Sequence, residues 1–465
     1  MKKIGLTILM LAVASTSAFA AVQNLKVSGS VRSTFIHREN FDLGKAPTGD
    51  EIQDIFITNT HLRLDADLTD KVSATIDLLN ERAWGNDTAS AGLETGVKIN
   101  LAYVTLREML YSPLTIVVGR QLLRYGNQFV LGESKEPVFP PGSSNLSFVA
   151  FDQSDVESFD AVKFILDYQP LTIDIFYAKI DSNTVAGASE DDDDIDFYGI
   201  YSVYDFENVA KTKIDAYFLA KIDKYVANNA SPAPATGIKP DTIYMPGFRV
   251  SSGLAEGLWT SLEVVWERGN KVLNSATPAE NQRREAFATQ LLTFYQLPVL
   301  KDYKPALIHE FTYTTGDSNK TDTAYSGEVS RNVFTAWDRL YEDQDNGSIL
   351  NTIVSLSNAV AHTVAFQFYP VEELKTVIAW TGLWTNTPIY SASEIIAQPD
   401  GFNVVTLTPG QREIGYEIDL FMYYQYTEDV EFNLSLGWVI LGDAVNDTAN
   451  PNGPFQVLAG TKVNF

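Results

Sequence analysis

Eight charged residues lie on or beside segments in which apolar residues alternate with polar ones, where they could line a water-filled path. The basic residues are Arg63, Arg120, Arg124 and Lys163, and the acidic residues are Asp65, Glu310, Glu417 and Asp419. A guanidinium offers five donors in a fixed fork, which suits carboxylates and hydroxyls. Opposed rows of charge in a pore select solutes by charge and orientation. The alternative interpretation is that these groups form structural ion pairs that satisfy one another.

The segments that must position these residues alternate between very short turns and long polar loops. The predicted strands are 24–37, 53–68, 71–82, 97–110, 114–122, 157–167, 170–181, 195–205, 211–224, 242–252, 257–268, 284–297, 302–315, 351–369, 373–386, 412–425, 431–441 and 453–465. The longest loops include 123–156, 316–350 and 387–411. This pattern predicts an all-β fold, a transmembrane antiparallel β-barrel of about 18 strands with long extracellular loops and short periplasmic turns. Such a barrel is roughly 35 Å across, which is too wide for side chains alone to fill.

The alternation is clearest in the last predicted strand. One face carries Phe455, Val457, Ala459, Thr461, Val463 and Phe465, and the other carries Gln456, Gly460, Lys462 and Asn464. The first face suits lipid and the second suits a wet lumen. The terminal Phe465 resembles the signal that the outer-membrane barrel assembly machinery reads, so this machinery is an expected partner.

The same alternation assigns a direction to some of the charged residues. Val162 and Phe164 have the spacing of lipid-facing residues, so Lys163 should face the lumen and Asp160 should lie at the rim. Segment 114–122 is apolar on both faces and gives no direction for Arg120. We expect Arg120 to point inward because an arginine facing lipid at the bilayer midplane costs about 2–4 kcal/mol.

The first residues have the composition of a secretory signal peptide. Lys2 and Lys3 precede an apolar run, and Ala18-Phe19-Ala20 is a typical cleavage site. We therefore expect residues 1–20 to be a cleaved signal peptide and residues 21–465 to form a single barrel domain in the outer membrane of a Gram-negative-type cell. The chain has no Cys, which excludes disulfides and a lipoprotein anchor. Its net charge of −25 argues against nucleic acid as a partner.

An acidic run from Glu190 to Asp194, followed by Asp196, falls in a predicted extracellular loop. A solvated, repulsive loop is the simpler interpretation. Binding of divalent cations that bridge surface lipopolysaccharide is the alternative, although no D-x-D-x-D-G calcium pattern is present.

The sequence offers little for bond chemistry. The chain has four histidines, and none of them has a zinc-binding spacing such as H-E-x-x-H. It also has no G-x-S-x-G, P-loop or dinucleotide-binding glycine pattern. We expect no enzyme activity, no catalytic residue, no cofactor and no metal site.

Four segments together resemble one known family of barrels. They are Gly119-Arg120-Gln121-Leu122-Leu123-Arg124-Tyr125-Gly126, Ser158-Phe159-Asp160-Ala161, Tyr313-Thr314-Thr315-Gly316-Asp317 and Gly415-Tyr416-Glu417-Ile418-Asp419-Leu420. Their order and spacing are similar to those of the alginate export family of outer-membrane barrels. The resemblance implies an eighteen-stranded barrel, and the best-known members export alginate through a lumen lined by Arg and Lys.

We therefore predict an outer-membrane channel of the alginate export type, in which solute diffuses passively through a charge-lined pore. The solute is expected to be an anionic polysaccharide or a sugar acid. Two alternatives stay open: a cation- or nutrient-selective porin on the same scaffold, and a barrel that serves as a docking partner in a complex. Outer-membrane lipid and lipopolysaccharide are expected neighbours, and the barrel is expected to be a monomer.

Overall fold

The computed structural model describes part of the chain. The described residues are 23–41, 52–85, 96–132, 151–156, 158–182, 194–224, 239–273, 280–317, 333–344, 346–354, 356–389, 408–445 and 453–465. The proposed signal peptide and most of the acidic run lie outside these residues. Within the described ranges, no helix is long and apolar enough to cross a membrane.

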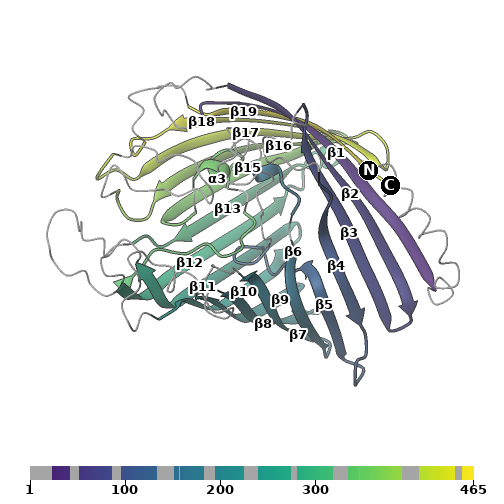
Figure 1. Cartoon of the computed structure of the whole chain (residues 1–465). Coiled ribbons are helices and arrows are strands. Elements are labelled where there is room, and N and C mark those ends of the chain that lie inside the picture. Colours follow the sequence, from purple (N-terminus) through teal and green to yellow (C-terminus); the bar gives the residue numbers. More distant parts are fainter. Residues whose placement is uncertain are drawn as a thin grey trace.

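Eighteen long strands form one closed antiparallel barrel in which each strand pairs with its neighbours along the chain (Figure 1). The strands are β1 (Asn24–Glu39), β2 (Ile52–Thr69), β3 (Val72–Ala83), β4 (Lys98–Leu106), β5 (Leu114–Leu122), β6 (Ser158–Asp167), β7 (Leu171–Ser182), β8 (Asp194–Phe206), β9 (Thr212–Asp223), β10 (Asp241–Ala255), β11 (Leu258–Leu273), β12 (Glu280–Gln296), β13 (Ala306–Thr314), β15 (Ala359–Val371), β16 (Leu374–Thr385), β17 (Glu413–Gln425), β18 (Val430–Leu441) and β19 (Phe455–Asn464). The predicted fold class and the eighteen barrel strands are confirmed.

The barrel closes where β19 pairs with β1, with Ser30 opposite Asn464 and Glu39 opposite Phe455. Beyond the last paired residue, Gly29 and Phe465 exchange two backbone hydrogen bonds of 2.8 and 3.0 Å. A Cβ on Gly29 would lie 2.6 Å from the Phe465 ring, so glycine makes room for the terminal aromatic. The chain end is therefore part of the seam that closes the barrel.

The outer face is a band of apolar side chains. One row crosses five neighbouring strands through the cross-strand partners Val104, Val118, Val162, Tyr177 and Tyr198. Four of these five residues are among the exposed large hydrophobic residues, as expected of side chains that face lipid.

The main difference from the predicted strands is at 351–369. The structure has a short helix, α3 (Leu350–Ile353), in this region, and β15 starts only at Ala359. Ile353, Val354 and Leu356 are at most 3% exposed because they pack against the inside of the barrel wall. These apolar residues have the pattern of a lipid-facing strand, but they belong to a loop that folds inward and packs inside the barrel.

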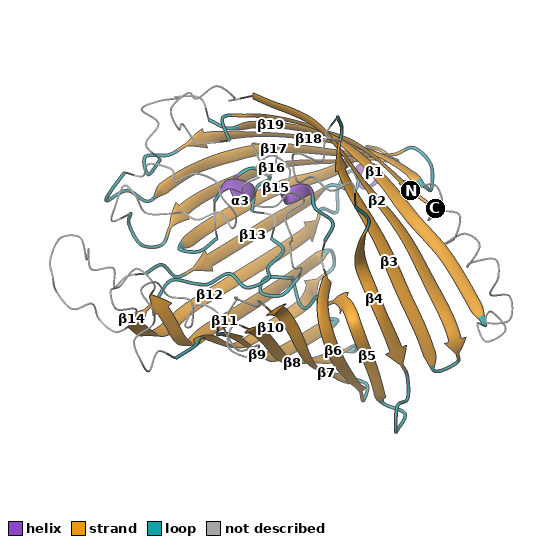
Figure 2. Ribbon diagram, in the orientation of Figure 1, coloured by secondary structure: helices purple, strands orange, loops and turns teal. Residues whose placement is uncertain are grey.

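Three minor elements complete the described fold. They are the 3₁₀ turns η3 (Phe151–Gln153) and η4 (Lys301–Tyr303), and the two-residue strand β14 (Val333–Phe334). β14 lies outside the barrel order and pairs in parallel with the start of β12. Figure 2 shows α3 among the strands of the barrel.

Two apolar clusters lie inside the barrel. The larger joins inward side chains of β6 to β12, such as Phe176, Phe197 and Met245, to loop residues that include Phe129 and Trp337. The smaller joins β15 to β18 to Ile349, Leu350 and Ile353. Part of the lumen is therefore filled by loops that carry their own hydrophobic side chains.

Candidate functional site: the narrowed lumen

Three loop segments enter the lumen and reduce the open path. We call them the inward segments: residues 123–132, 151–156 and 335–354, the last described except for residue 345. Each follows or precedes a long strand, and each bonds to polar side chains on the inner wall. The wall residues that hold them include charged and neutral polar side chains of the inner face.

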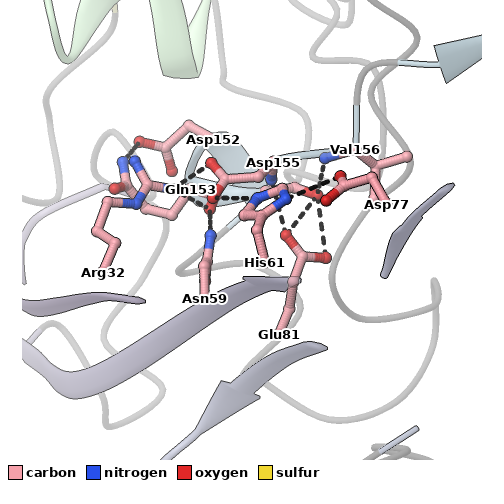
Figure 3. Close-up of polar contacts among 10 residues, drawn as sticks. Arg32, Asn59, His61, Asp77, Glu81, Asp152, Gln153, Asp155 and Val156 are labelled. Carbon is pink, nitrogen blue, oxygen red and sulfur yellow. Dashed lines mark hydrogen bonds and ion pairs between the residues drawn. The ribbon is translucent and has the colours of Figure 1, made fainter. Parts of the chain in front are cut away.

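Segment 151–156 lies against β1, β2 and β3 (Figure 3). The Nη2 atom of Arg32 donates to the Oδ1 atom of Asp155 at 2.5 Å and to the carbonyl oxygen of Gln153 at 3.0 Å. Asn59 donates to the same carbonyl oxygen at 2.8 Å. The Nε2 atom of His61 lies 3.3 Å from the other carboxylate oxygen of Asp155. The segment therefore offers carboxylate and carbonyl oxygens to basic wall residues.

Two further contacts fix the ends of this segment. Arg38 is 1% exposed and donates to both carboxylate oxygens of Asp152, at 2.9 and 2.6 Å. Its Nε atom donates to Gln456 at 2.7 Å, and its guanidinium lies over the Phe41 ring. Glu81 accepts from the backbone N–H of Asp155 at 2.7 Å. These buried contacts are structural anchors.

Asp155 belongs to a loop and not to a membrane-spanning strand. Burial opposes its charged form, but the hydrogen bond with His61 and the charge of Arg32 hold the pKa of this carboxyl below the ordinary aspartate value of 3.8. A carboxyl with a lowered pKa stabilises its docked state above the ordinary value and loses that contribution as pH falls through the lowered pKa.

Acid should therefore release this contact only at low pH. The groups that face Asp155 are Arg32, His61 and Glu81. We expect single-channel conductance to stay constant from pH 7 down to pH 5 and to change only below about pH 4. A conductance change centred between pH 5 and 6 that is lost in Asp155→Asn would contradict the lowered pKa of Asp155. A pH series in a planar bilayer measures this.

Segment 123–132 lies against the opposite part of the wall. Asn127 accepts from Arg249 at 3.2 Å and donates to Ser261 at 3.0 Å. Arg249 also donates to Asp215 at 2.7 Å. Leu131 forms an isolated parallel bridge with Tyr341 of the third inward segment, so the two segments support each other.

Segment 335–354 covers acidic residues of the wall. Glu417 is 0% exposed and accepts from the backbone N–H groups of Ile349 and Leu350 at 2.7 and 2.8 Å. Ser348 donates to Asp419 at 2.6 Å. A carboxylate at the backbone N–H groups that begin α3 holds the loop against β17, as a helix cap does.

Three of the four predicted acidic residues, Glu310, Glu417 and Asp419, thus face inward and contact this segment, whereas Asp65 lies beside Arg63 on β2. Glu310 accepts from Gln290 at 3.0 Å and from Asn346 at 3.1 Å. Asp419 is 1% exposed. Glu417 and Asp419 cannot touch a solute in this state, because the loop already occupies their hydrogen bonds. In this structure the two are anchors for the loop and do not line the pore.

The four predicted basic residues lie in three different places: on the inner face of the wall, on its outer face and in segment 123–132. Arg63 lies on the inner face of β2 and donates to Asp65 at 2.8 and 3.0 Å, with 39% of its side chain exposed. Lys163 lies on the inner face of β6, close enough to Asp174 for electrostatic attraction. Arg124 is exposed in segment 123–132, directly after the buried Leu123.

The predicted inward direction of Arg120 is wrong. Arg120 shares its face of β5 with the exposed Val118, donates to Ser158 at 2.9 Å and lies 3.6 Å from Asp160. It borders a shallow depression together with the exposed Ile99 of β4. The outward position costs little because the residue lies near the long-loop end of β5, beside a carboxylate, and not at the midplane.

This difference gives a direct test. Replacing Arg63 with glutamine should shift the reversal potential in a salt gradient toward cation selectivity, because it removes a cation from the lumen. The same change at Arg120 should leave the reversal potential unchanged. Equal shifts for the two variants would contradict the assignment of Arg120 to the outer face.

The described part of the acidic run also differs from the expectation. Asp194 and Asp196 are not in a loop but on the outer face of β8, where both bind the ammonium group of Lys179. These two carboxylates are therefore paired with a side-chain cation. Residues 190–193 lie outside the described residues.

Sequence reasoning missed several inward basic residues, namely Arg32, Arg38, Arg249 and Arg284. The face on which they lie could have been inferred from the alternation along each strand. For example, Phe248 lies on the outer face, which places its neighbour Arg249 on the inner face. Arg284, 0% exposed, bonds to Asp241 and Asp338 at 2.8 and 3.1 Å. Their loop partners could not be inferred from local sequence.

A closed barrel with a charged, loop-narrowed lumen defines the class of outer-membrane porins. The solved structures with a similar fold include three Pseudomonas aeruginosa proteins. OccK11 (OpdR) is 10% identical over 96% of this chain and 97% of that chain, with a TM-score of 0.54. OpdK, solved with vanillate, is 9% identical over 96% and 99%, with a TM-score of 0.54. OccK2 (OpdF), solved with glucuronate, is 10% identical over 96% and 99%, with a TM-score of 0.51.

At these identities the likeness shows the fold alone. The family is shown by sequence: residues 23–457 match the alginate export family, and the chain belongs to that family. No curated protein matches the chain significantly. The chain is therefore an outer-membrane porin-type channel, as predicted.

Proposed function

We propose that the channel passes small organic anions of the sugar-acid class by passive diffusion. The observation that carries the proposal is a strip of basic residues on the inner faces of β19, β1 and β2, which we call the basic strip. Its members are Lys26, Arg32, His61, Arg63 and Lys462. Cross-strand pairing brings them together, with Arg32 opposite Lys462 and His61 opposite Ser30.

The chemistry of a uronate suits such a strip. Its carboxylate can pair with a guanidinium, and its hydroxyls can exchange hydrogen bonds with polar wall residues. A series of accessible cations lets an anion move between sites that are each weak enough to leave. That OpdK and OccK2 were solved with a carboxylate ligand adds support by analogy only.

The negative net charge of the chain is compatible with a path for anions through the lumen. Several inward carboxylates are at most 2% exposed, among them Glu263, Glu267, Glu417 and Asp419. Their charge is turned toward loop backbone and wall partners and away from the open path. The charge that a solute meets is therefore set by the accessible inward residues, which are the basic strip together with its partly exposed partners Asp65 and Asp155.

The three inward segments favour monomers and short oligomers over a long polysaccharide. The apolar clusters fix segments 123–132 and 335–354 to the wall, and polar contacts fix segment 151–156, so widening the path would break these contacts and expose buried apolar surface. We expect permeation to fall steeply as the length of the uronate chain increases.

Single-channel recording of the refolded barrel in a planar bilayer tests the proposal. Anion selectivity in a salt gradient, with faster permeation of glucuronate than of alginate oligomers, supports it. Cation selectivity would overturn it in favour of a cation or nutrient porin. A closed barrel that binds periplasmic components would favour the docking alternative.

We also propose that the barrel works without bond chemistry, as a monomer, after removal of residues 1–20. Phe465 is 62% exposed at the seam, which makes it accessible to an assembly machinery during insertion. Exposed outer-face residues such as Phe164 and Ile200 would contact lipid, and lipopolysaccharide would contact the long-loop rim.

A further inference from the structure

Asp155 is bound by the wall in the way that a solute carboxylate would be. One of its oxygens accepts from Arg32 at 2.5 Å, and the other lies 3.3 Å from His61. His61 is itself oriented by Asp77, 2.9 Å from its other ring nitrogen. A guanidinium and an imidazole that converge on one carboxylate form a ready carboxylate-binding site.

The ion pair between Arg32 and Asp155 is partly accessible to solvent, unlike the ion pair between Arg38 and Asp152 in the same segment. The side chains of Arg32, Asp155 and His61 are 28%, 24% and 20% exposed. The Arg38 side chain, which holds Asp152, is only 1% exposed. Exposed ion pairs contribute little and exchange readily, whereas buried ones are costly to break. The segment thus has one fixed carboxylate and one exchangeable carboxylate.

The backbone of the segment does not depend on the Asp155 side chain. Asn59 donates to the carbonyl oxygen of Gln153 at 2.8 Å, and Glu81 accepts from the N–H of Asp155 at 2.7 Å. Ser154 also donates to Glu81, at 3.1 Å. The Asp155 carboxylate could therefore swing away while the segment stays in place.

We propose that Arg32 and His61 form a binding site for the carboxylate of a permeating organic anion, and that Asp155 occupies this site when no solute is present. The incoming carboxylate exchanges with that of Asp155, so the two wall groups always face one anion. The proposal rests on the proposed function and specifies its first binding site. Toward the short-turn end, Arg63 lies opposite Ser28, four residues from Arg32 along β1 or about 13 Å, and offers the next cation.

The test compares Asp155→Asn with the unaltered barrel. The readout is the concentration of glucuronate that half-blocks the single-channel current. Removing the internal competitor should lower this concentration by about fivefold, as expected when a partly exposed ion pair no longer occupies the site. The matched control is Asp67→Asn, which removes one carboxylate from β2 where the bonded partner is the neutral Asn24. The control should stay within twofold of the unaltered barrel.

Two further variants identify the site. Arg32→Gln alone should raise the half-blocking concentration, and Arg32→Gln combined with Asp155→Asn should abolish the gain. Heat-dependent migration in gels verifies that each barrel is folded. An unchanged or higher half-blocking concentration in folded Asp155→Asn overturns the inference, as does a gain that persists without Arg32. The selectivity of the unaltered barrel tests the proposed function separately.

Discussion

Replacing Arg38 with glutamine should release segment 151–156 from the wall and widen the pore. The substitution leaves the Asp152 carboxylate without its bidentate partner in a poorly solvated site. Breaking a buried ion pair by removing one partner costs about 3 kcal/mol or more. We expect a clear rise in single-channel conductance, with more frequent current fluctuations, while the barrel itself remains closed.

The control for this variant is Arg107→Gln, which removes an exposed arginine from the turn after β4. Its conductance should match that of the unaltered barrel. Replacing both partners with apolar residues, Arg38→Met with Asp152→Leu, should restore part of the closed behaviour because no unpaired charge remains. If Arg38→Gln conducts like the unaltered barrel, the anchor assignment is wrong.

Replacing Glu417 with glutamine should free segment 335–354. Glu417 accepts hydrogen bonds from two backbone N–H groups and from Ser348 at 3.0 Å, all in a fully buried site. An amide presents its NH₂ group to at least one of these donors, and each buried group left unsatisfied costs about 1–3 kcal/mol. We expect larger, less steady currents and faster protease cleavage of this loop.

A second variant reaches the same contact from the loop. Gly347 has a φ of 82°, and a Cβ at this position would lie 2.3 Å from a Glu417 carboxylate oxygen. Gly347→Ala should therefore act like Glu417→Gln. Glu428→Gln, in the exposed turn before β18, should have no effect on the current. Normal currents in both test variants would contradict the capping role of Glu417.

The fold was largely predictable because lipid and water impose opposite demands on alternate residues. Each of the eighteen predicted segments overlaps one barrel strand, since the period of two is a local signal. The prediction placed the start of one strand too early, before Ala359, because the apolar residues there pack inside the lumen and do not belong to a strand. A local pattern reports that a side chain is apolar, but not which apolar surroundings cover it.

The site was less predictable for two physical reasons. β5 is apolar on both faces, with Val117 buried on the inner face and Val118 exposed on the outer face, so the alternation could not orient Arg120. Glu310, Glu417 and Asp419 do face inward, but residues far away in sequence cover them. Which wall charges stay accessible depends on long-range loop packing.

The apolar clusters inside the lumen have a consequence for the order of assembly. The backbone ladder from β1 to β19 is complete without any contact from the inward segments. Strand closure and loop docking are therefore separate steps, and the second must expel water from the lumen as Phe129, Trp337 and Ile349 become buried. We expect a newly closed barrel to be transiently leaky. It should acquire its selectivity only after the inward segments have docked and displaced water from part of the lumen.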